Sequence, residues 1–276
     1  MNRRSTQEKA LLFRALHEAP GAFVIPNPWD AGSARLLAAQ GFQALATSSF
    51  GSALAAGVWD GALSRDEVIA SARSVVEACD LPVSADLEAG FGGTPGAIAE
   101  TFRLAGEVGL VGGSIEDYTG DPSRPFYEIE EAVDRLSAAV EAARALPFPF
   151  TLTARAENYF RGNADLDDTI RRLQAFEAAG ADVLFAPGLP TLDAVRAVCS
   201  SVSKPVTVLA GLPGTRFSVE DLAAAGVKRI SVGGALYKAA LREFVSAVAE
   251  IQKSGTFGFT EMLPTGPEIK RWFGMG

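Results

Sequence analysis

The stretch Ser84-Ala-Asp-Leu-Glu-Ala-Gly-Phe-Gly-Gly93 decides how this chain folds. It follows Leu81-Pro-Val83, so it has the pattern of an apolar strand that runs into a glycine-rich turn. Side chains alternate along a strand, which places Asp86 and Glu88 on one face and the apolar residues between them on the other. A buried strand that ends in two carboxylates indicates a polar site at its carboxyl end.

The same unit, a short apolar strand followed by an amphipathic segment, repeats along the whole chain. The eight expected strands cover residues 23–27, 44–49, 83–88, 113–117, 150–156, 181–186, 205–210 and 229–234. Helical patterns include residues 30–40, 64–78, 129–145 and 167–179. Eight uninterrupted β-α units predict an α/β protein with a (β/α)8 TIM-type barrel, and a doubly wound open sheet is the structural alternative.

The helices also carry a recurring stop signal. Gly41, Gly180 and Gly226 each follow a helical pattern and precede the next strand. Glycine at this position favours a left-handed C-cap, because it lacks the Cβ atom that would be strained there.

No linker or low-complexity stretch divides the 276 residues, so we expect a single barrel domain over residues 1–276. Residues 254–276 break the β-α pattern and form a C-terminal tail with apolar side chains among glycines and prolines. Such a tail is expected to pack either on its own barrel or on a neighbouring subunit.

Composition limits the partners of this protein. The net charge is -8 with a pI of about 4.9, and no cluster of lysine and arginine stands out, which argues against nucleic acid. No apolar run reaches the roughly 18 residues of a membrane span. Two cysteines outside any CxxC pattern, and an N-terminus without a signal-type apolar region, predict a cytoplasmic protein.

Three neighbouring strands place ionisable groups at their carboxyl ends, where barrel active sites are built. Asp86 and Glu88 end the third strand, and Ser114 with Glu116 repeats the arrangement on the fourth. On the fifth strand, one face carries Thr151, Thr153, Arg155 and Glu157.

Three carboxylates in one barrel mouth repel each other unless they are neutralised. A divalent cation can do this, and an all-oxygen ligand set favours Mg²⁺, with Mn²⁺ as an alternative. Asp60 is a candidate outer ligand, and the turn Thr47-Ser-Ser-Phe-Gly51 offers hydroxyls and backbone N–H groups to an anion. The structural alternative is a barrel whose acids are merely paired with arginines.

Six stretches of this chain resemble the isocitrate lyase/phosphoenolpyruvate mutase superfamily, and within it the carboxyphosphonoenolpyruvate phosphonomutase-like proteins. The resemblance covers nearly the whole chain, and the stretches are residues 27–31, 46–49, 84–92, 113–117, 153–155 and 229–234. It implies a barrel whose C-terminal helix swaps between subunits of a homodimer or homotetramer.

The resemblance also implies the roles of the site residues. Mg²⁺ would lie near Asp86, Glu88 and Glu116, and Asp60 would reach it through water. A 2-oxo acid or its enolate would bind this metal. The residues that would contact the acid are Ser48, Ser49, Phe50, Trp29 and Arg155.

One loop departs from the family pattern. Members that cleave isocitrate or methylisocitrate carry Lys-Lys-Cys-Gly-His after the fourth strand, and the thiol donates a proton. Here residues 117–127 contain no Cys, His or Lys, and offer Tyr118, Arg124 and Tyr127 instead. Arg124 is a candidate catalytic residue that would clamp a second anionic group, or else a solvated loop charge. The only histidine, His17, is expected at the surface.

These observations predict a Mg²⁺-dependent enzyme that acts on a small 2-oxo acid through a metal-stabilised enolate. Candidate substrates are pyruvate, oxaloacetate and 2-oxoglutarate, and the reaction is of lyase, decarboxylase or phosphonomutase type. The missing loop motif argues against a true isocitrate or methylisocitrate lyase. The alternative is a 2-oxo acid binding protein without turnover.

Overall fold

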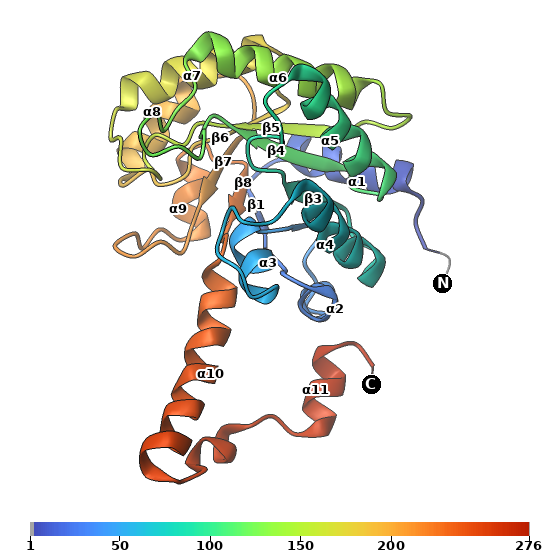
Figure 1. Cartoon of the computed structure of the whole chain (residues 1–276), viewed down its shortest axis with the longest axis vertical. Helices are drawn as coiled ribbons and strands as arrows, with labels where there is room; N and C mark the ends of the chain where they lie inside the picture. Colours follow the sequence, from blue (N-terminus) through green and yellow to red (C-terminus); the bar gives the residue numbers. More distant parts are fainter. Residues whose placement is uncertain (1–2, 276) are drawn as a thin grey trace.

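Figure 1 shows the computed structural model, which describes residues 3–275. The strands are β1 (Phe23–Ile25), β2 (Leu45–Ala46), β3 (Val83–Asp86), β4 (Gly112–Glu116), β5 (Thr151–Arg155), β6 (Val183–Phe185), β7 (Val206–Leu209) and β8 (Arg229–Ser231). All pairings between them are parallel, and the spatial order β1-β8-β7-β6-β5-β4-β3-β2 follows the sequence around the sheet. The seam between β1 and β2 is bridged by the Ala46 N–H, which donates to the Pro26 carbonyl at 3.1 Å. The predicted (β/α)8 barrel is confirmed, and the open sheet is excluded.

Most of the helices surround this barrel, and those after the last strand project from it. The helices are α1 (Thr6–Glu18), α2 (Ala31–Ala39), α3 (Ser49–Ala55), α4 (Arg65–Ala78), α5 (Pro95–Glu107), α6 (Ile129–Arg144), α7 (Leu166–Ala178), α8 (Leu192–Ser201), α9 (Val219–Ala224), α10 (Ala235–Ser254) and α11 (Gly266–Trp272), with a 3-10 turn η1 (Gly258–Met262). Their starts are fixed locally: at α4, Ser64 and Glu67 cap each other's backbone N–H groups. Gly41, Gly180 and Gly226 have φ of 87°, 102° and 95°, as predicted for the helix ends.

The alternation of side chains along the strands separates two regions. Val83 and Ala85 of β3 are buried against the helices, in one large apolar core that also includes Phe102 and Leu152. The alternate residues of β3, Ser84 and Asp86, face the barrel interior and line its cavity. This is the geometry predicted from the alternation of side chains along a strand.

A second, smaller apolar cluster closes the amino-terminal end of the barrel, which we call the floor. Phe13 of α1 lies there, fully buried, with Phe23, Ile25 and Val111. His17 is also part of the floor and only 6% exposed, so the expectation of a surface position was wrong. The other end of the barrel, where the strands finish, is the one we call the mouth.

The C-terminal segment leaves the barrel. In Figure 1, α10 projects away from the strands and α11 returns beside α2, where the Gln40 side chain donates to the Trp272 carbonyl at 3.2 Å. No residue of α10 is buried, and Phe244 is 67% exposed. The projecting arm therefore includes α10 as well as the expected tail from residue 254. Within the described residues, none of the helices combines the length and the apolar character needed to cross a bilayer.

Candidate active site

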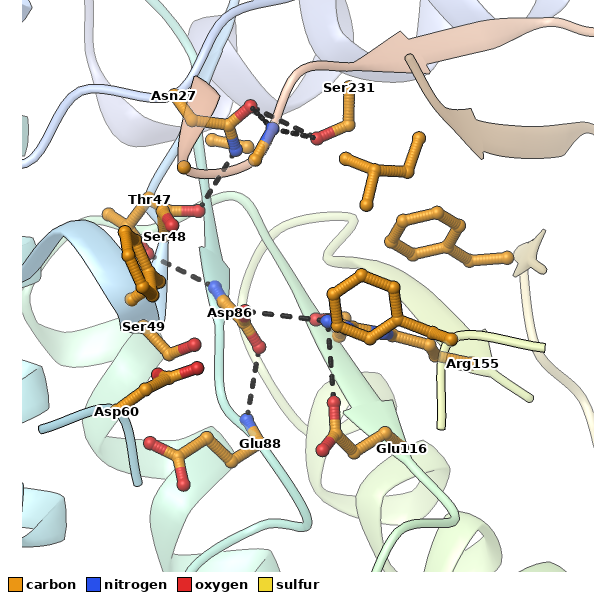
Figure 2. Close-up of a pocket in the computed structure, with 18 of the residues that line it drawn as sticks. Asn27, Thr47, Ser48, Ser49, Asp60, Asp86, Glu88, Glu116, Arg155 and Ser231 are labelled. Carbon is orange, nitrogen blue, oxygen red and sulfur yellow. Dashed lines mark hydrogen bonds and ion pairs between the residues drawn. The ribbon is translucent and has the colours of Figure 1, made fainter. Parts of the chain in front are cut away.

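A cavity of about 530 Å³ opens at the mouth of the barrel. It contains most of the predicted site residues, several of which are drawn in Figure 2. Those that line it are Ser48, Ser49, Phe50, Asp60, Asp86, Glu88, Glu116 and Arg155. Five segments that are far apart in the sequence thus supply these residues to one cavity.

Asp86 and Glu88 enter the cavity for different reasons. Asp86 is the last residue of β3, and its N–H donates to the Thr47 hydroxyl at 3.1 Å. Glu88 lies beyond the strand, with a left-handed φ of 48°, and its N–H donates to Asp86 Oδ1 at 3.3 Å (Figure 2). Strand alternation therefore explains the direction of Asp86, whereas a strained turn sets the direction of Glu88.

Arg135 of α6 holds this turn from behind. It is buried, and its Nη2 donates to the carbonyl oxygens of Ala89 at 2.6 Å and Gly92 at 2.8 Å. Its guanidinium also lies 4.3 Å from the centroid of the Tyr127 ring. A charged donor on two carbonyls fixes the loop that carries Glu88.

Arg155 lies at the centre of the acidic residues. Its Nη1 is 3.4 Å from Asp86 Oδ2 and 3.3 Å from Glu116 Oε2, and its Nε bonds to Glu157. Burial opposes its charge, but Glu157, Glu116 and Asp86 more than offset that effect and raise the pKa of Arg155. Arg155 is thus a permanent cation between Asp86 and Glu116, and Figure 2 draws its ion pairs with both.

The structure adds Arg161, which the sequence did not reveal. It lines the cavity, pairs with Glu157 at 2.9 Å and Glu116 at 3.6 Å, and lies 3.8 Å from the centroid of the Tyr118 ring. Glu157, in contrast, is fully buried beneath the two arginines. The spacing of Glu157 and Arg161, four residues apart, was the only signal in the sequence.

Asn27 joins three strand ends and was also missed as a site residue. Its Oδ1 accepts from the Ser231 hydroxyl at 3.0 Å and from the Gly233 N–H at 2.8 Å (Figure 2). Its Nδ2 donates to the Thr47 carbonyl at 3.2 Å. The side chain therefore fastens the turn after β2 to the end of β8 across the seam of the barrel.

Two predicted site residues lie away from the cavity. Trp29 packs edge-on against Tyr237, with ring centroids 5.2 Å apart. Arg124 is exposed and pairs with Glu131 of α6. Of the two loop tyrosines, Tyr118 lines the cavity and Tyr127 packs under Arg135 instead.

The carboxylates on one side of the mouth lack cations of their own. Among the described residues, neither Asp60 nor Glu88 forms an ion pair, and Asp60 Oδ1 is buried without a hydrogen-bond partner. Burial, together with the charges of Asp86 and Asp60, raises the pKa of Glu88 to about 7. Burial also raises the pKa of Asp60, and burial with the nearby Glu157 raises that of Glu116. This part of the mouth has an excess of negative charge.

That excess is what a hard dication would relieve. Within residues 3–275 no group of three or more His, Cys, Asp or Glu side chains is arranged to hold a metal ion as it stands. Arg155 draws Asp86 and Glu116 to itself, while Mg²⁺ commonly keeps several waters and needs few direct ligands. The all-oxygen donor set and the orphaned Asp60 oxygen fit such an ion, held partly through water.

The fold and the site together define the class: a (β/α)8-barrel protein with an acidic mouth built around one arginine. The family of phosphoenolpyruvate phosphomutase matches residues 13–252. The chain therefore belongs to the phosphoenolpyruvate phosphomutase family, within the superfamily of lyases and mutases that its motifs indicated.

Individual relatives agree with this assignment. A 2-methylisocitrate lyase of Shewanella oneidensis is 30% identical over 260 residues, which are 91% of this chain and 87% of the relative. A structure from Burkholderia cenocepacia, described as a candidate lyase/mutase, is 56% identical with a TM-score of 0.94, over 97% of this chain and 96% of the other. A phosphonopyruvate hydrolase in complex with oxalate and Mg²⁺ is 24% identical, with a TM-score of 0.84 over 96% and 95% of the two chains, and shows the shared fold.

Proposed function

We propose that this protein is a Mg²⁺-dependent enzyme that acts on a small 2-oxo acid, such as pyruvate, oxaloacetate or 2-oxoglutarate. The observation that carries the proposal is the composition of one cavity, in which the unpaired carboxylates of Asp60 and Glu88 join Asp86 and Glu116, which share Arg155. The acids that would hold the cation are Asp86, Glu88, Glu116 and Asp60. Mn²⁺, with the same preference for oxygen, would be accepted in its place.

The positive groups of the cavity would bind and orient the acid. Arg155 can donate to the substrate's oxygens, and the turn of Ser48, Ser49 and Phe50 offers hydroxyl and N–H donors to its carboxylate. The bound cation would supply additional positive charge close to the carboxylate and keto oxygen of the acid. Together these groups favour an enolate over the neutral keto form, because its negative charge develops where the donors already lie.

The reaction that this site supports best is cleavage of a bond on the carbon next to the keto group of the 2-oxo acid. In the decarboxylation of oxaloacetate, the C3–C4 bond breaks, CO2 leaves, and the bonding electrons form the enolate of pyruvate, which then takes a proton at C3. Tyr118 is the loop residue placed to supply or relay that proton, because it lines the cavity beside Arg161. Cleavage of a related carbon–carbon bond and a phosphonomutase reaction use the same enolate, and Arg161 adds a second cation that a phosphonate would need.

The loop after β4 favours these reactions over cleavage of isocitrate or methylisocitrate. Residues 117–127 have no cysteine, histidine or lysine, so the usual thiol acid is missing. The same observation favours the second candidate, a 2-oxo acid binding protein that has lost turnover.

We also propose that two or four copies assemble through the C-terminal arm, with α10 and α11 exchanged between neighbours. The supporting observation is the exposed apolar surface of the arm, including Phe244, Val245 and Met262 at 67%, 55% and 89% exposure. A cytoplasmic location is proposed as well, since both Cys79 and Cys199 are free thiols.

Oxalate is a suitable probe, since this planar dianion has the shape and charge of the pyruvate enolate. We expect oxalate and Mg²⁺ together, but neither alone, to raise the melting temperature, because only the native protein binds the pair. Asp86→Asn and Arg155→Met should abolish the shift, while the surface variant Arg196→Met should retain it. An equal shift in Asp86→Asn would contradict the assigned cation site.

Turnover separates the enzyme from the binding protein. With Mg²⁺ and oxaloacetate, pyruvate should form faster than with Mg²⁺ alone, and Tyr118→Phe should slow this by about 10²-fold if it supplies the proton. Tight oxalate binding without a rate above the metal background would instead support the binding protein.

A further inference from the structure

Arg229 is a buried cation inside the barrel, and within residues 3–275 no acidic side chain pairs with it. It is the first residue of β8 and is 5% exposed. It lines the lower part of the same cavity, in register with Thr207 on one neighbouring strand and Phe23 on the other. Phe23 belongs to the apolar cluster of the floor, so this strand neighbour offers the guanidinium no counter-charge.

Most of its hydrogen-bonding capacity is unused. Nη2 donates to the Thr153 hydroxyl at 3.0 Å, whereas Nε and Nη1 are buried and have no partner among the described residues. The Thr207 hydroxyl is likewise buried without a partner. Unsatisfied donors from two adjacent strands thus meet in one space.

The acidic groups of the mouth do not compensate this charge. In the described chain Arg229 forms no ion pair, while Asp86, Glu116 and Glu157 pair with Arg155. Arg155 lies two residues above Thr153 on β5, roughly 7 Å along the strand, so the acids are one layer higher. Burial lowers the pKa of Arg229 to about 9, which leaves it charged at pH 7.

His17 is affected by this charge from the floor of the barrel. Burial and the positive charge of Arg229 lower the pKa of His17 to about 3, so the histidine is neutral and adds no second positive charge. A buried charge without a partner is strongly destabilising. Water could accept hydrogen bonds from the free N–H groups of Arg229, but a neutral molecule cannot neutralise the charge of the guanidinium.

We propose that Arg229, Thr153 and Thr207 form an anion subsite below the main site, which binds a small group of single negative charge. That group is either a free monovalent ion or the far carboxylate of a dicarboxylate seated in the mouth. Binding of a free ion is independent of the reaction at the mouth. Binding of a far carboxylate rests on the proposed function, in which the mouth binds a 2-oxo acid.

Bromide tests the subsite directly because it scatters X-rays anomalously. In crystals of the full chain soaked in sodium bromide, an anomalous peak is expected in contact with Nε or Nη1 of Arg229. Water alone at this position, without an anomalous peak, would overturn the free-ion form. Water alone at the same position in crystals whose dicarboxylate binds outside the subsite would overturn the subsite altogether.

Stability in solution provides a second readout. At constant ionic strength, with gluconate as the balancing ion, bromide or formate should raise the melting temperature saturably by about 2–5 °C. Thr207→Val keeps the shape of the side chain and should weaken this response several-fold, and Arg229→Gln should remove it. The exposed control Arg196→Gln, which changes the charge equally, should respond like the unaltered protein. An unchanged response in both Arg229→Gln and Thr207→Val would refute the subsite.

Competition distinguishes the two sources of the anion. If a far carboxylate occupies the subsite, bromide should weaken binding of 2-oxoglutarate but not of pyruvate, and Arg229→Gln should erase that difference. If only a free ion binds, bromide should not weaken the binding of 2-oxoglutarate relative to the binding of pyruvate. The soaks in sodium bromide alone contain no 2-oxo acid. A missing bromide peak in them would therefore be distinct from a failure of the proposed function.

Discussion

At the level of single residues, the burial of His17 in the floor of the barrel should make the stability of the protein depend on pH. Its Nδ1 donates to the Phe13 carbonyl at 2.8 Å, and its ring packs edge-on against Phe13 and Phe23. Nε2 is buried without a partner in the described chain. Protonation of this nitrogen would therefore place a second charge beside Arg229 in an apolar cluster.

This arrangement predicts acid sensitivity. The native pKa is about 3 and the unfolded value 6.5, so below pH 6.5 the unfolded chain binds a proton that the native protein does not. The free energy of unfolding should fall by about 2–3 kcal/mol between pH 6.5 and 4.5 from this group. His17→Gln, which keeps a neutral polar side chain, should show a correspondingly smaller fall in urea titrations.

The same group can be followed by NMR, since the chain has one histidine. Its ring resonances should stay constant from pH 8 to pH 5. A titration midpoint near 6.5 in the native protein would contradict the buried, neutral state.

Arg135 is expected to support the site without contacting a ligand itself, so its replacement should disturb ligand binding indirectly. Arg135→Met removes the donors to the Ala89 and Gly92 carbonyls, so the turn that carries Glu88 loses its support. We expect about 10-fold weaker binding of the oxalate–Mg²⁺ pair, typical of a lost outer contact, measured by calorimetry.

The matched control is Arg103→Met on the neighbouring α5, where the arginine is exposed and pairs with Glu100 and Glu107. It should bind oxalate as the unaltered protein does. Equal affinity in both variants would show that the turn holds its shape without Arg135.

At the level of elements, α1 and β4 meet closely at the floor. A Cβ atom on Gly112 would lie 2.8 Å from the Phe13 ring and 2.9 Å from the Thr151 carbonyl oxygen. The carbonyl belongs to the neighbouring strand and cannot move without disturbing the sheet. Glycine at this position is thus what allows Phe13 of α1 to pack this closely on β4.

Gly112→Ala should lower the free energy of unfolding by about 2–3 kcal/mol, the usual cost of forcing a methyl group into a packed core. Gly93→Ala is the control, because nothing lies within 4 Å of the added atom. The urea midpoints of the two variants provide the comparison, and a Gly112→Ala midpoint as high as that of Gly93→Ala would mean that α1 can shift.

At the level of the whole molecule, the arm formed by α10, η1 and α11 is the least buried part of the chain. An apolar helix that projects from a barrel has little to stabilise it in isolation. Assembly with another copy would cover its surface.

Replacing Phe244 and Val245 together by aspartate should convert the assembly into monomers of 28.9 kDa, measured by sedimentation. The exposed neighbour Arg242→Ala should leave the assembly unchanged. A monomer for the unaltered protein at micromolar concentration would contradict the proposed exchange of α10 and α11.

The sequence by itself determined the barrel and the core of its acidic mouth. The eight β-α units and the period-two alternation place Asp86, Glu116 and Arg155 in the interior, because strand geometry depends only on local backbone conformation.

Only the tertiary structure decided which other groups join them. Glu88 faces the cavity through a left-handed turn held by Arg135 of another element, and Arg161 enters from a loop that has no period. Trp29 and Arg124 contact other partners, and His17 is buried where α1 packs against Phe23 of β1. Each of these outcomes depends on which distant residues pack together, and neither spacing nor residue type in the chain encodes that contact on its own.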